Sequence, residues 1–178
     1  MKNTLKAIIC SMILFNALPV RAQDPHFVSA TLIVNAPMTA VWAALKTQRG
    51  ADSARRRVIS NQGSDYVVEE TFTKIPVLGQ AVCRYSEHEI PGKGIEYKMI
   101  SSDKFTAFEG EWHLQALAAG QTAVTLNSYV DTGLHLPFAA AITRENTKKS
   151  VDLRIKDIVQ LVASEQKVHL ALNNVKLN

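Results

Sequence analysis

A glutamate and an arginine on two neighbouring strand-like segments are the side chains of this 178-residue chain best placed for polar chemistry. Glu70 shares a parity with the apolar Phe72, and Arg84 shares a parity with Val82. In a hairpin centred on Val77, Glu70 and Arg84 lie directly opposite each other and pair across the strands. We expect this pair at a cavity wall, where it anchors a ligand's head group. The alternative is an ordinary exposed ion pair, which contributes little.

Residue types that often carry catalysis form no recognised pattern. The five histidines lack HExxH or comparable metal spacing, and Cys83 has no partner that the sequence identifies. Glu109, Glu111 and His113 share one strand face, which could in principle bind a metal or move protons. That parity lies opposite Trp112, so a solvent-facing polar side is the favoured interpretation. With no nucleophile elbow, phosphate loop or dinucleotide fingerprint, the sequence predicts no catalytic residue, metal or cofactor.

The first 22 residues have the pattern of a secretory signal peptide. Lys2 and Lys6 precede an apolar run over residues 7–18, and Ala22 is the expected cleavage site. A retained membrane anchor is the alternative, but an anchor needs about 18 apolar residues and this run is shorter. We therefore expect a periplasmic or secreted protein whose mature chain, residues 23–178, forms a single domain.

Charge and cysteine content narrow the possible partners. Lys2, Lys6 and Arg21 supply three of the four excess positive charges, so the mature chain is nearly neutral. A general electrostatic attraction to nucleic acid is therefore not expected. Cys83 is the one cysteine left after cleavage, which rules out an intrachain disulfide. It is either a buried small apolar residue, as we expect, or an exposed reactive thiol. We expect a monomer.

Hydrophobic periodicity predicts the elements that position these side chains. Residues 26–35 alternate as a strand, and after Pro37 the apolar residues Met38, Val41 and Leu45 fall at helical spacing. A polar, arginine-rich stretch after Gly50 has the character of a second short helix. Short turns then separate six further strands, which implies an antiparallel sheet. We predict these strands at residues 57–61, 65–73, 80–90, 95–101, 105–117 and 122–130.

One long helix is expected from Phe138 to near the end of the chain. Val151, Ile155, Ile158 and Val162 form an apolar stripe at spacings of four, three and four. Residues 143–150 are almost wholly polar, which is typical of a helix whose earlier half covers something less tightly packed. A loop between two shorter helices is the alternative.

This order of elements resembles the helix-grip fold of the START-like superfamily (SRPBCC), which includes polyketide cyclases, coenzyme Q-binding proteins and birch-pollen-type allergens. The segment Val34-Asn35-Ala36-Pro37 followed by Val41-Trp42-Ala43-Ala44-Leu45 is similar to that family's entry into its first helix. The segment from Phe108-Glu109-Gly110-Glu111-Trp112 through Asp131-x-Gly133-x-x-Leu136-Pro137 resembles the approach to the final helix in lipid-binding START domains. Thr132 departs from the pattern, because many START domains have proline there.

The resemblance implies an α+β fold in which a curved antiparallel sheet wraps around a long C-terminal helix, with one or two short helices after the first strand. It also implies a cavity between sheet and helix that holds a hydrophobic molecule. The alternative is a solid core filled by the same side chains. The candidate ligand-binding residues are Glu70, Arg84, Tyr97, Met99, Phe108, Trp112 and Leu126.

Two functional classes follow, with a third behind them. The first is a non-enzymatic carrier or sensor of a lipid, quinone or similar molecule. The second, implied by the cyclase-type relatives, uses the same cavity as a reaction vessel, with Glu70, Arg84 or Tyr97 as acid, base or orienter. The third is a filled core with a protein-binding surface. The apolar turn Ile75-Pro76-Val77-Leu78 closes the cavity as a lid, packs onto its neighbours, or makes transient contact with a membrane or a partner.

Overall fold

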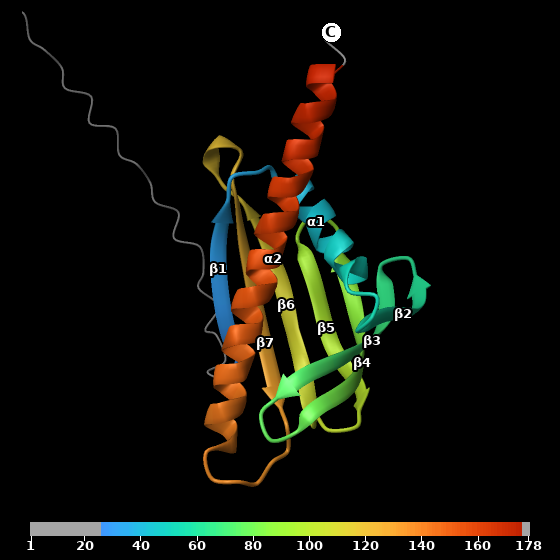
Figure 1. Cartoon of the computed structure of the whole chain (residues 1–178), viewed down its shortest axis with the longest axis vertical. Helices are drawn as coiled ribbons and strands as arrows, with labels where there is room; N and C mark the ends of the chain where they lie inside the picture. Colours follow the sequence, from blue (N-terminus) through green and yellow to red (C-terminus); the bar gives the residue numbers. More distant parts are fainter. Residues whose placement is uncertain (1–25, 176–178) are drawn as a thin grey trace, which may run out of the picture.

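A single curved sheet carries the chain, and the computed structural model describes the backbone of residues 26–175 with most of their side chains. Seven antiparallel strands lie in the order β1-β7-β6-β5-β4-β3-β2 (Figure 1). The strands are β1 (Val28–Val34), β2 (Arg56–Gln62), β3 (Asp65–Ile75), β4 (Gly79–Ile90), β5 (Gly94–Ser102), β6 (Ala107–Ala116) and β7 (Thr122–Asp131). The helices are α1 (Met38–Ala51), α2 (Ala139–Val175) and a short 3-10 helix, η1 (Ala118–Gly120).

Local connections build most of this sheet. Each strand from β2 to β6 pairs with the next strand in the chain through a short connection, as the turn signals predicted. The long-range pairing joins the first and the last strand of the chain: β1 pairs with β7, which places Val28 opposite Ser128. The second short helix expected after Gly50 is absent from the described residues, because residues 52–55 form turns. The strand predicted at residues 57–61 is confirmed as β2.

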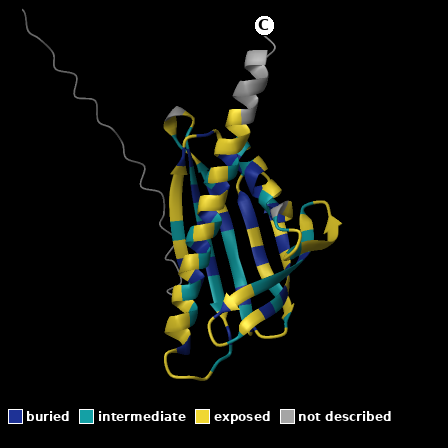
Figure 2. Ribbon diagram, viewed as in Figure 1, coloured by how far each residue is buried: buried dark blue, intermediate teal, exposed yellow. Residues whose placement is uncertain are grey.

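The concave face of the sheet carries the core. Along β4 the buried residues alternate with exposed ones, so Ala81, Cys83 and Tyr85 point inward (Figure 2). Cys83 is fully buried, as expected, and burial, with the negative charges of Glu70 and Asp103, raises the pKa of its thiol to about 12. The thiol therefore stays protonated and packs as a small apolar group.

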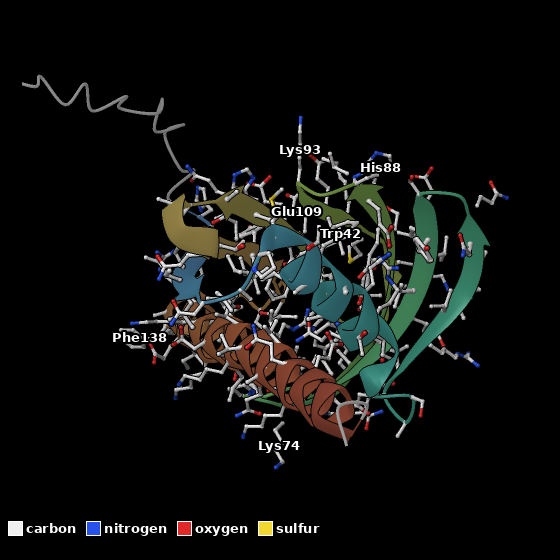
Figure 3. The ribbon with its side chains drawn as sticks, turned by 90° about the horizontal axis from the view of Figure 1, so that it is seen from above. Trp42, Lys74, His88, Lys93, Glu109 and Phe138 are labelled. Atoms are coloured by element: carbon white, nitrogen blue, oxygen red, sulfur yellow. The ribbon has the colours of Figure 1, made fainter. Side chains whose placement is uncertain are left out.

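The two helices cover this concave face. Seen from above, α1 and α2 lie side by side on the inner side of the sheet, while Lys93 and His88 lie on its outer side (Figure 3). The predicted stripe of α2 is confirmed, because Val151, Ile155 and Ile158 are almost completely buried against the strands. The alternative of two shorter helices is wrong, since α2 continues unbroken from Ala139 to Val175. None of the described helices is long and apolar enough to span a membrane.

A β-bulge near the end of β3 sets the register of the central hairpin. Thr73 pairs with Gln80, but the next pair is Ile75 with Gly79, so Lys74 is an extra residue on β3. Its backbone has a φ of 60°, in the left-handed region. A hairpin without this bulge would be centred on Val77. The extra residue shifts every pair beyond it by one position. Each residue of β3 therefore faces the β4 residue next to the one that it would face in a hairpin without the bulge.

Candidate functional site

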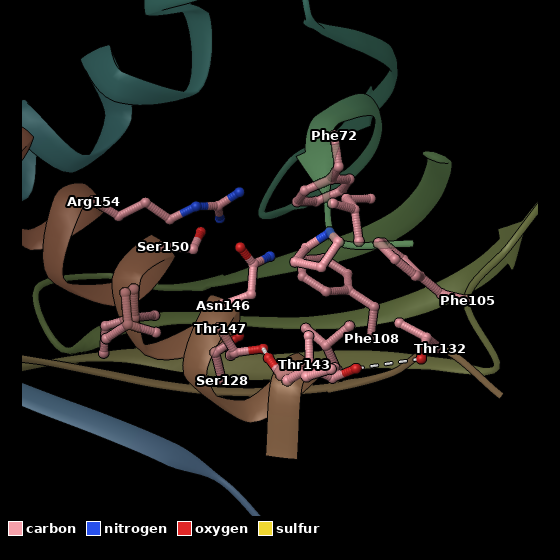
Figure 4. A pocket seen from close by; sticks show the side chains of 16 residues that line it. Phe72, Phe105, Phe108, Ser128, Thr132, Thr143, Asn146, Thr147, Ser150 and Arg154 are labelled. Carbon is pink, nitrogen blue, oxygen red and sulfur yellow. Dashed lines mark hydrogen bonds between the residues drawn. The ribbon is translucent and has the colours of Figure 1, made fainter. Parts of the chain in front are cut away.

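Two adjacent hollows lie between the sheet and α2. An inner cavity of about 50 Å³ lies under the first half of α2, against β3, β6 and β7 (Figure 4). An outer groove of about 970 Å³ runs along β3 and the same helix and opens to solvent. Both hollows are lined by the same five residues, Phe72, Ile75, Asn146, Ser150 and Arg154. We call these two hollows the inner cavity and the outer groove.

Aromatic rings form the sheet side of the inner cavity. Phe72 packs edge-on against Phe105 and Phe108, with ring centroids 5.4 and 5.2 Å apart. Phe108 in turn packs against Tyr85 and Tyr97, with centroids 5.1 and 5.0 Å away. Edge-to-face contacts of this kind stabilise an aromatic cluster beyond simple burial. These rings pack against one another on the sheet side, and the inner cavity beside them is small.

Polar side chains form the helix side of the same cavity. Thr143, Asn146, Thr147 and Ser150 are spaced by three and four residues, which places them on the inward face of α2. The Thr147 hydroxyl donates a hydrogen bond to the Thr143 carbonyl at 2.9 Å. This polar stretch lies where the apolar stripe of α2 fades, so the prediction of looser packing there is confirmed. The inner cavity therefore has one apolar wall and one polar wall.

A buried carboxylate with three partners lies at the edge of the outer groove. Arg56 donates from Nε and Nη2 to Glu70 Oε2 at 3.1 and 2.7 Å. Arg154 Nη2 donates to Oε1 at 2.7 Å, and the Tyr85 hydroxyl donates to Oε2 at 2.7 Å. Burial alone would raise the pKa of Glu70, but the charges of Arg154 and Arg56, together with the Tyr85 hydrogen bond, outweigh it and hold this pKa at about 2. Glu70 is therefore ionised throughout the physiological range.

This cluster has more positive than negative charge. Two guanidinium groups surround one carboxylate, and the pKa of Arg154 is raised because the nearby Glu70 charge outweighs the effect of burial. The outer groove as a whole is lined by five basic side chains and three acidic ones. The basic ones are Arg55, Arg56, Lys74, Lys149 and Arg154, and the acidic ones are Asp52, Glu70 and Asp157.

The predicted pairing of Glu70 with Arg84 is wrong. The bulge at Lys74 places Glu70 opposite Cys83 and places Glu69 opposite Arg84. Arg84 lies on the outer face of the sheet with 45 % of its side chain exposed, and its Nη2 contacts Glu69 Oε2 at 2.9 Å. Glu70 does lie at a cavity wall, as expected, but its partners come from β2, β4 and α2.

The other candidate residues divide between cavity and core. Phe108 and Leu126 line the inner cavity. Tyr97 and Trp112 are buried in the core, and Met99 packs against it. The Tyr97 hydroxyl donates to the Asn127 carbonyl at 3.3 Å over the small residue Gly110, where a Cβ atom would meet that hydroxyl at 2.3 Å. Burial raises the pKa of Tyr97 to about 12.

Sequence reasoning missed the two arginines of the site. Arg56 belongs to a run of three arginines, which has the character of a solvated charge run. The register between β2 and β3 shows that Arg56 instead lies opposite Glu70, on the inner face of the sheet. Arg154 lies one residue before Ile155 and three after Val151. Its position beside the apolar stripe of the helix could have identified it, because a charged residue there lies at the edge of the buried surface.

A second buried charge cluster fastens α1 to the sheet. Arg49 Nε contacts Glu87 Oε2 at 2.5 Å, and its Nη1 contacts Glu89 Oε1 at 2.7 Å. Its guanidinium also lies 3.8 Å from the ring centroid of Tyr66. Burial would lower the pKa of Arg49, but the two carboxylates raise it. Because both carboxylates on β4 are occupied by Arg49, we assign this cluster a structural role.

Glu109, Glu111 and His113 lie on the face of β6 opposite Trp112, as predicted. His113 is exposed, whereas the two glutamates are half-buried. Glu111 accepts a hydrogen bond from the Asn127 side chain at 2.9 Å. Among the residues that the structure describes, no group of three histidine, cysteine, aspartate or glutamate side chains is arranged to hold a metal ion.

Comparison with solved structures places this architecture in a known fold. A protein from Thermus thermophilus is 16% identical with a TM-score of 0.63, and the match covers 78% of this chain and 98% of that one. A START superfamily protein from Mycobacterium smegmatis is 14% identical with a TM-score of 0.63, covering 78% and 98%. The Zhui aromatase/cyclase from Streptomyces sp. R1128 is 17% identical with a TM-score of 0.62, covering 81% and 94%.

These likenesses define the class of protein by its fold. The chain has the START-like helix-grip fold, as its sequence predicted. No family model matches the chain, and no curated protein matches it. At these levels of identity the likeness concerns the fold alone, so function has to be argued from the site itself.

Proposed function

We propose that this protein binds a largely apolar small molecule, such as a lipid or a quinone, without changing it chemically. One observation carries the proposal: the inner cavity has an aromatic wall on the sheet and a polar wall on α2, and it shares five lining residues with the outer groove. A molecule with an apolar body and a few polar atoms matches two unlike walls of this kind.

The size of the inner cavity determines how such a molecule is held. Sites for small organic ligands usually enclose about 300–1,000 Å³, and the inner cavity has about 50 Å³. The outer groove, at about 970 Å³, is large enough. Phe72 lines both hollows and is half-buried. In our proposal the ligand lies in the outer groove, and movement of the Phe72 ring lets its apolar end enter the inner cavity.

The protonation states of the buried groups favour binding over catalysis. A general acid or base works best when its pKa lies near the working pH. The pKa of Glu70 is held at about 2 and that of Tyr97 is raised to about 12. Neither side chain exchanges protons readily at neutral pH, which weighs against the cyclase-type alternative.

We also propose that the ligand is exchanged with a membrane at one end of the molecule. The β3–β4 turn and the loop between β7 and α2 lie at this end, opposite the C-terminus (Figure 1). Val77 and Phe138 are 69% and 81% exposed there, with φ angles of 68° and 64° that bulky residues rarely adopt. Strained residues of this kind cluster at functional sites. Lys74 and Lys104 add positive charge nearby, which attracts anionic lipid head groups.

Export remains part of the proposal. The expected signal peptide, residues 1–22, lies outside the described residues, so its support is the sequence pattern alone. A periplasmic carrier matches a hydrophobic ligand that must cross an aqueous space. Sequencing the N-terminus of the protein recovered from a periplasmic extract tests this proposal, with Gln23 as the expected first residue.

Mass spectrometry of the purified mature protein tests the binding function. We expect an organic extract of the protein to contain about one apolar molecule per protein chain. The same extract of protein that has been unfolded, freed of small molecules and refolded should lack it. Adding that molecule back should raise the melting temperature, because a ligand that binds only the folded state stabilises it. A protein that yields no such molecule, and that no lipid or quinone stabilises, would contradict the proposal.

A further inference from the structure

We propose that Arg56 and Arg154 bind an anionic head group, so that the ligand is an amphiphile with a carboxylate or similar anion at one end. This inference rests on the proposed function and adds the chemical class of the ligand. In this arrangement the head group lies in the outer groove beside the two guanidinium groups, and the tail passes Phe72 toward the inner cavity.

The first argument is the charge of the cluster. The side chains of Arg56, Arg154 and Glu70 are only 12%, 18% and 14% exposed, so water screens them weakly. Two cations share one anion, and Tyr85 contributes a neutral donor. A positive charge that is largely removed from water and only half neutralised is costly. A second anion placed against the two guanidinium groups removes that cost.

The second argument is that donors of the protein already occupy most of the carboxylate. Glu70 accepts four hydrogen bonds, two from Arg56, one from Arg154 and one from Tyr85. A carboxylate offers about four acceptor sites. An alcohol or ammonium head group therefore has to compete with two arginines and a tyrosine for Glu70, whose Oε2 accepts three of these hydrogen bonds and whose Oε1 accepts the fourth. Glu70 instead holds the two guanidinium groups in place.

The third argument is that the arginines retain donors. The hydrogen bonds to Glu70 use Nε and Nη2 of Arg56 and Nη2 of Arg154. A guanidinium carries five N–H donors in a planar fork that matches a carboxylate or phosphate. Further N–H groups therefore remain on both side chains, and both side chains line the outer groove. Bonds between such ionised partners are about twice as strong as neutral ones.

The fourth argument is the position of Arg154 between the two hollows. Its side chain lines both of them, and its guanidinium carbon lies 5.8 Å from the ring centroid of Phe72 (Figure 4). A head group bound at Arg154 therefore lies next to the passage into the aromatic cluster. The apolar tail of an amphiphile can start at this point and run against Phe72, Phe105 and Phe108.

Calorimetry with two probes of equal chain length tests the inference on the mature protein. Dodecanoate and dodecan-1-ol differ in the head group and share the tail. We expect the unaltered protein to bind dodecanoate about tenfold or more tightly than the alcohol, as a charge-assisted hydrogen bond implies. The preference should decrease as salt concentration rises, because salt screens the attraction between the head group and the arginines.

Three variants assign the preference to this cluster. Arg154→Gln should remove most of the preference for dodecanoate over the alcohol. Glu70→Gln should strengthen dodecanoate binding, because it removes the competing anion; weaker binding would overturn the assignment. Arg84→Gln, on the outer face, is the matched control and should change neither probe. Melting curves establish that each variant is folded. If a variant does not fold, the salt dependence measured on the unaltered protein still tests the inference.

The two proposals fail in different ways. Equal affinity for the two probes, independent of salt, would overturn the anionic head group and leave apolar binding intact. A preference for dodecanoate that survives in both Arg154→Gln and Arg56→Gln would also overturn it, since the anion would then bind elsewhere. Binding of neither probe would contradict the proposed function as well.

Discussion

At the scale of single residues, the most informative group is the carboxylate of Glu70. Its three partners come from β2, β4 and α2, which are distant in sequence, and together they hold its pKa at about 2 instead of the ordinary 4.5. A lowered pKa means that the folded state prefers the ionised form. The partners therefore stabilise the fold wherever Glu70 is ionised.

This linkage predicts how stability depends on pH. The contribution of Glu70 is fully present above its ordinary pKa of 4.5 and is lost as pH falls through that value toward about 2. The full effect is on the order of 3 kcal/mol. We expect Glu70→Gln to lower the free energy of unfolding at pH 7 and to lower it much less at pH 2.5. Denaturant titrations at several pH values measure the difference. A deficit that stays constant down to pH 2.5 would contradict the role given to this carboxylate.

At the scale of elements, α2 combines two functions along one face. Its later part carries Val151, Ile155 and Ile158, which bury the helix against the sheet. Its earlier part carries Asn146 and Ser150, which line the hollows. The change from an apolar to a polar inward face within one unbroken helix separates the part that stabilises the fold from the part that meets the ligand in our proposal.

This division predicts the effect of filling the cavity from the helix side. Ser150→Leu adds volume where both hollows meet, so it should weaken binding of an apolar probe by about tenfold or more. Ala141→Leu is the control: it introduces the same side chain at an exposed position of α2 and should leave binding unchanged. Calorimetric titration of both variants with dodecanoate makes the comparison. Equal binding by the two variants would place the ligand away from the inner face of α2.

At the scale of the whole molecule, the two ends differ. One end carries the exposed Val77 and Phe138, and the inner cavity lies close to it, since Ile75, Pro76 and Ile142 line that cavity. Figure 3 shows Phe138 and Lys74 pointing away from the body of the protein. The C-terminal end of α2 lies at the opposite end (Figure 1). A membrane that meets the first end faces the hollows directly.

Vesicle binding tests this polarity. We expect the double change Val77→Ser and Phe138→Ser to reduce cosedimentation with vesicles of mixed neutral and anionic phospholipid by several-fold, because each buried apolar side chain contributes about 1.5–3 kcal/mol. Ile33→Ser is the control, since Ile33 is 60% exposed and lies on β1 near the opposite end. If the control reduces binding as much as the double change, the contact is not confined to the proposed end.

Much of the architecture followed from local patterns. The alternation over residues 26–35, the proline before the first helix and the stripe from Val151 to Val162 depend on neighbours a few positions away, and all three appear as predicted. The turn signals likewise placed consecutive strands next to each other. Periodicity reports which face of an element is buried and so indicated the order of elements, and the resemblance of this order and of two short segments to START-like proteins then indicated the helix-grip fold.

The partners of the charged residues were decided only by the tertiary structure. One extra residue, Lys74, moved Arg84 from Glu70 to Glu69, and a bulge of this kind leaves no periodic trace in the sequence. Arg56 and Arg154 reach Glu70 from a separate strand and a separate helix, so only their packing brings them together. The volume of the cavity was also decided by the tertiary structure. It depends on how closely Phe72, Phe105 and Phe108 pack, and these residues come from segments that are separated in the chain.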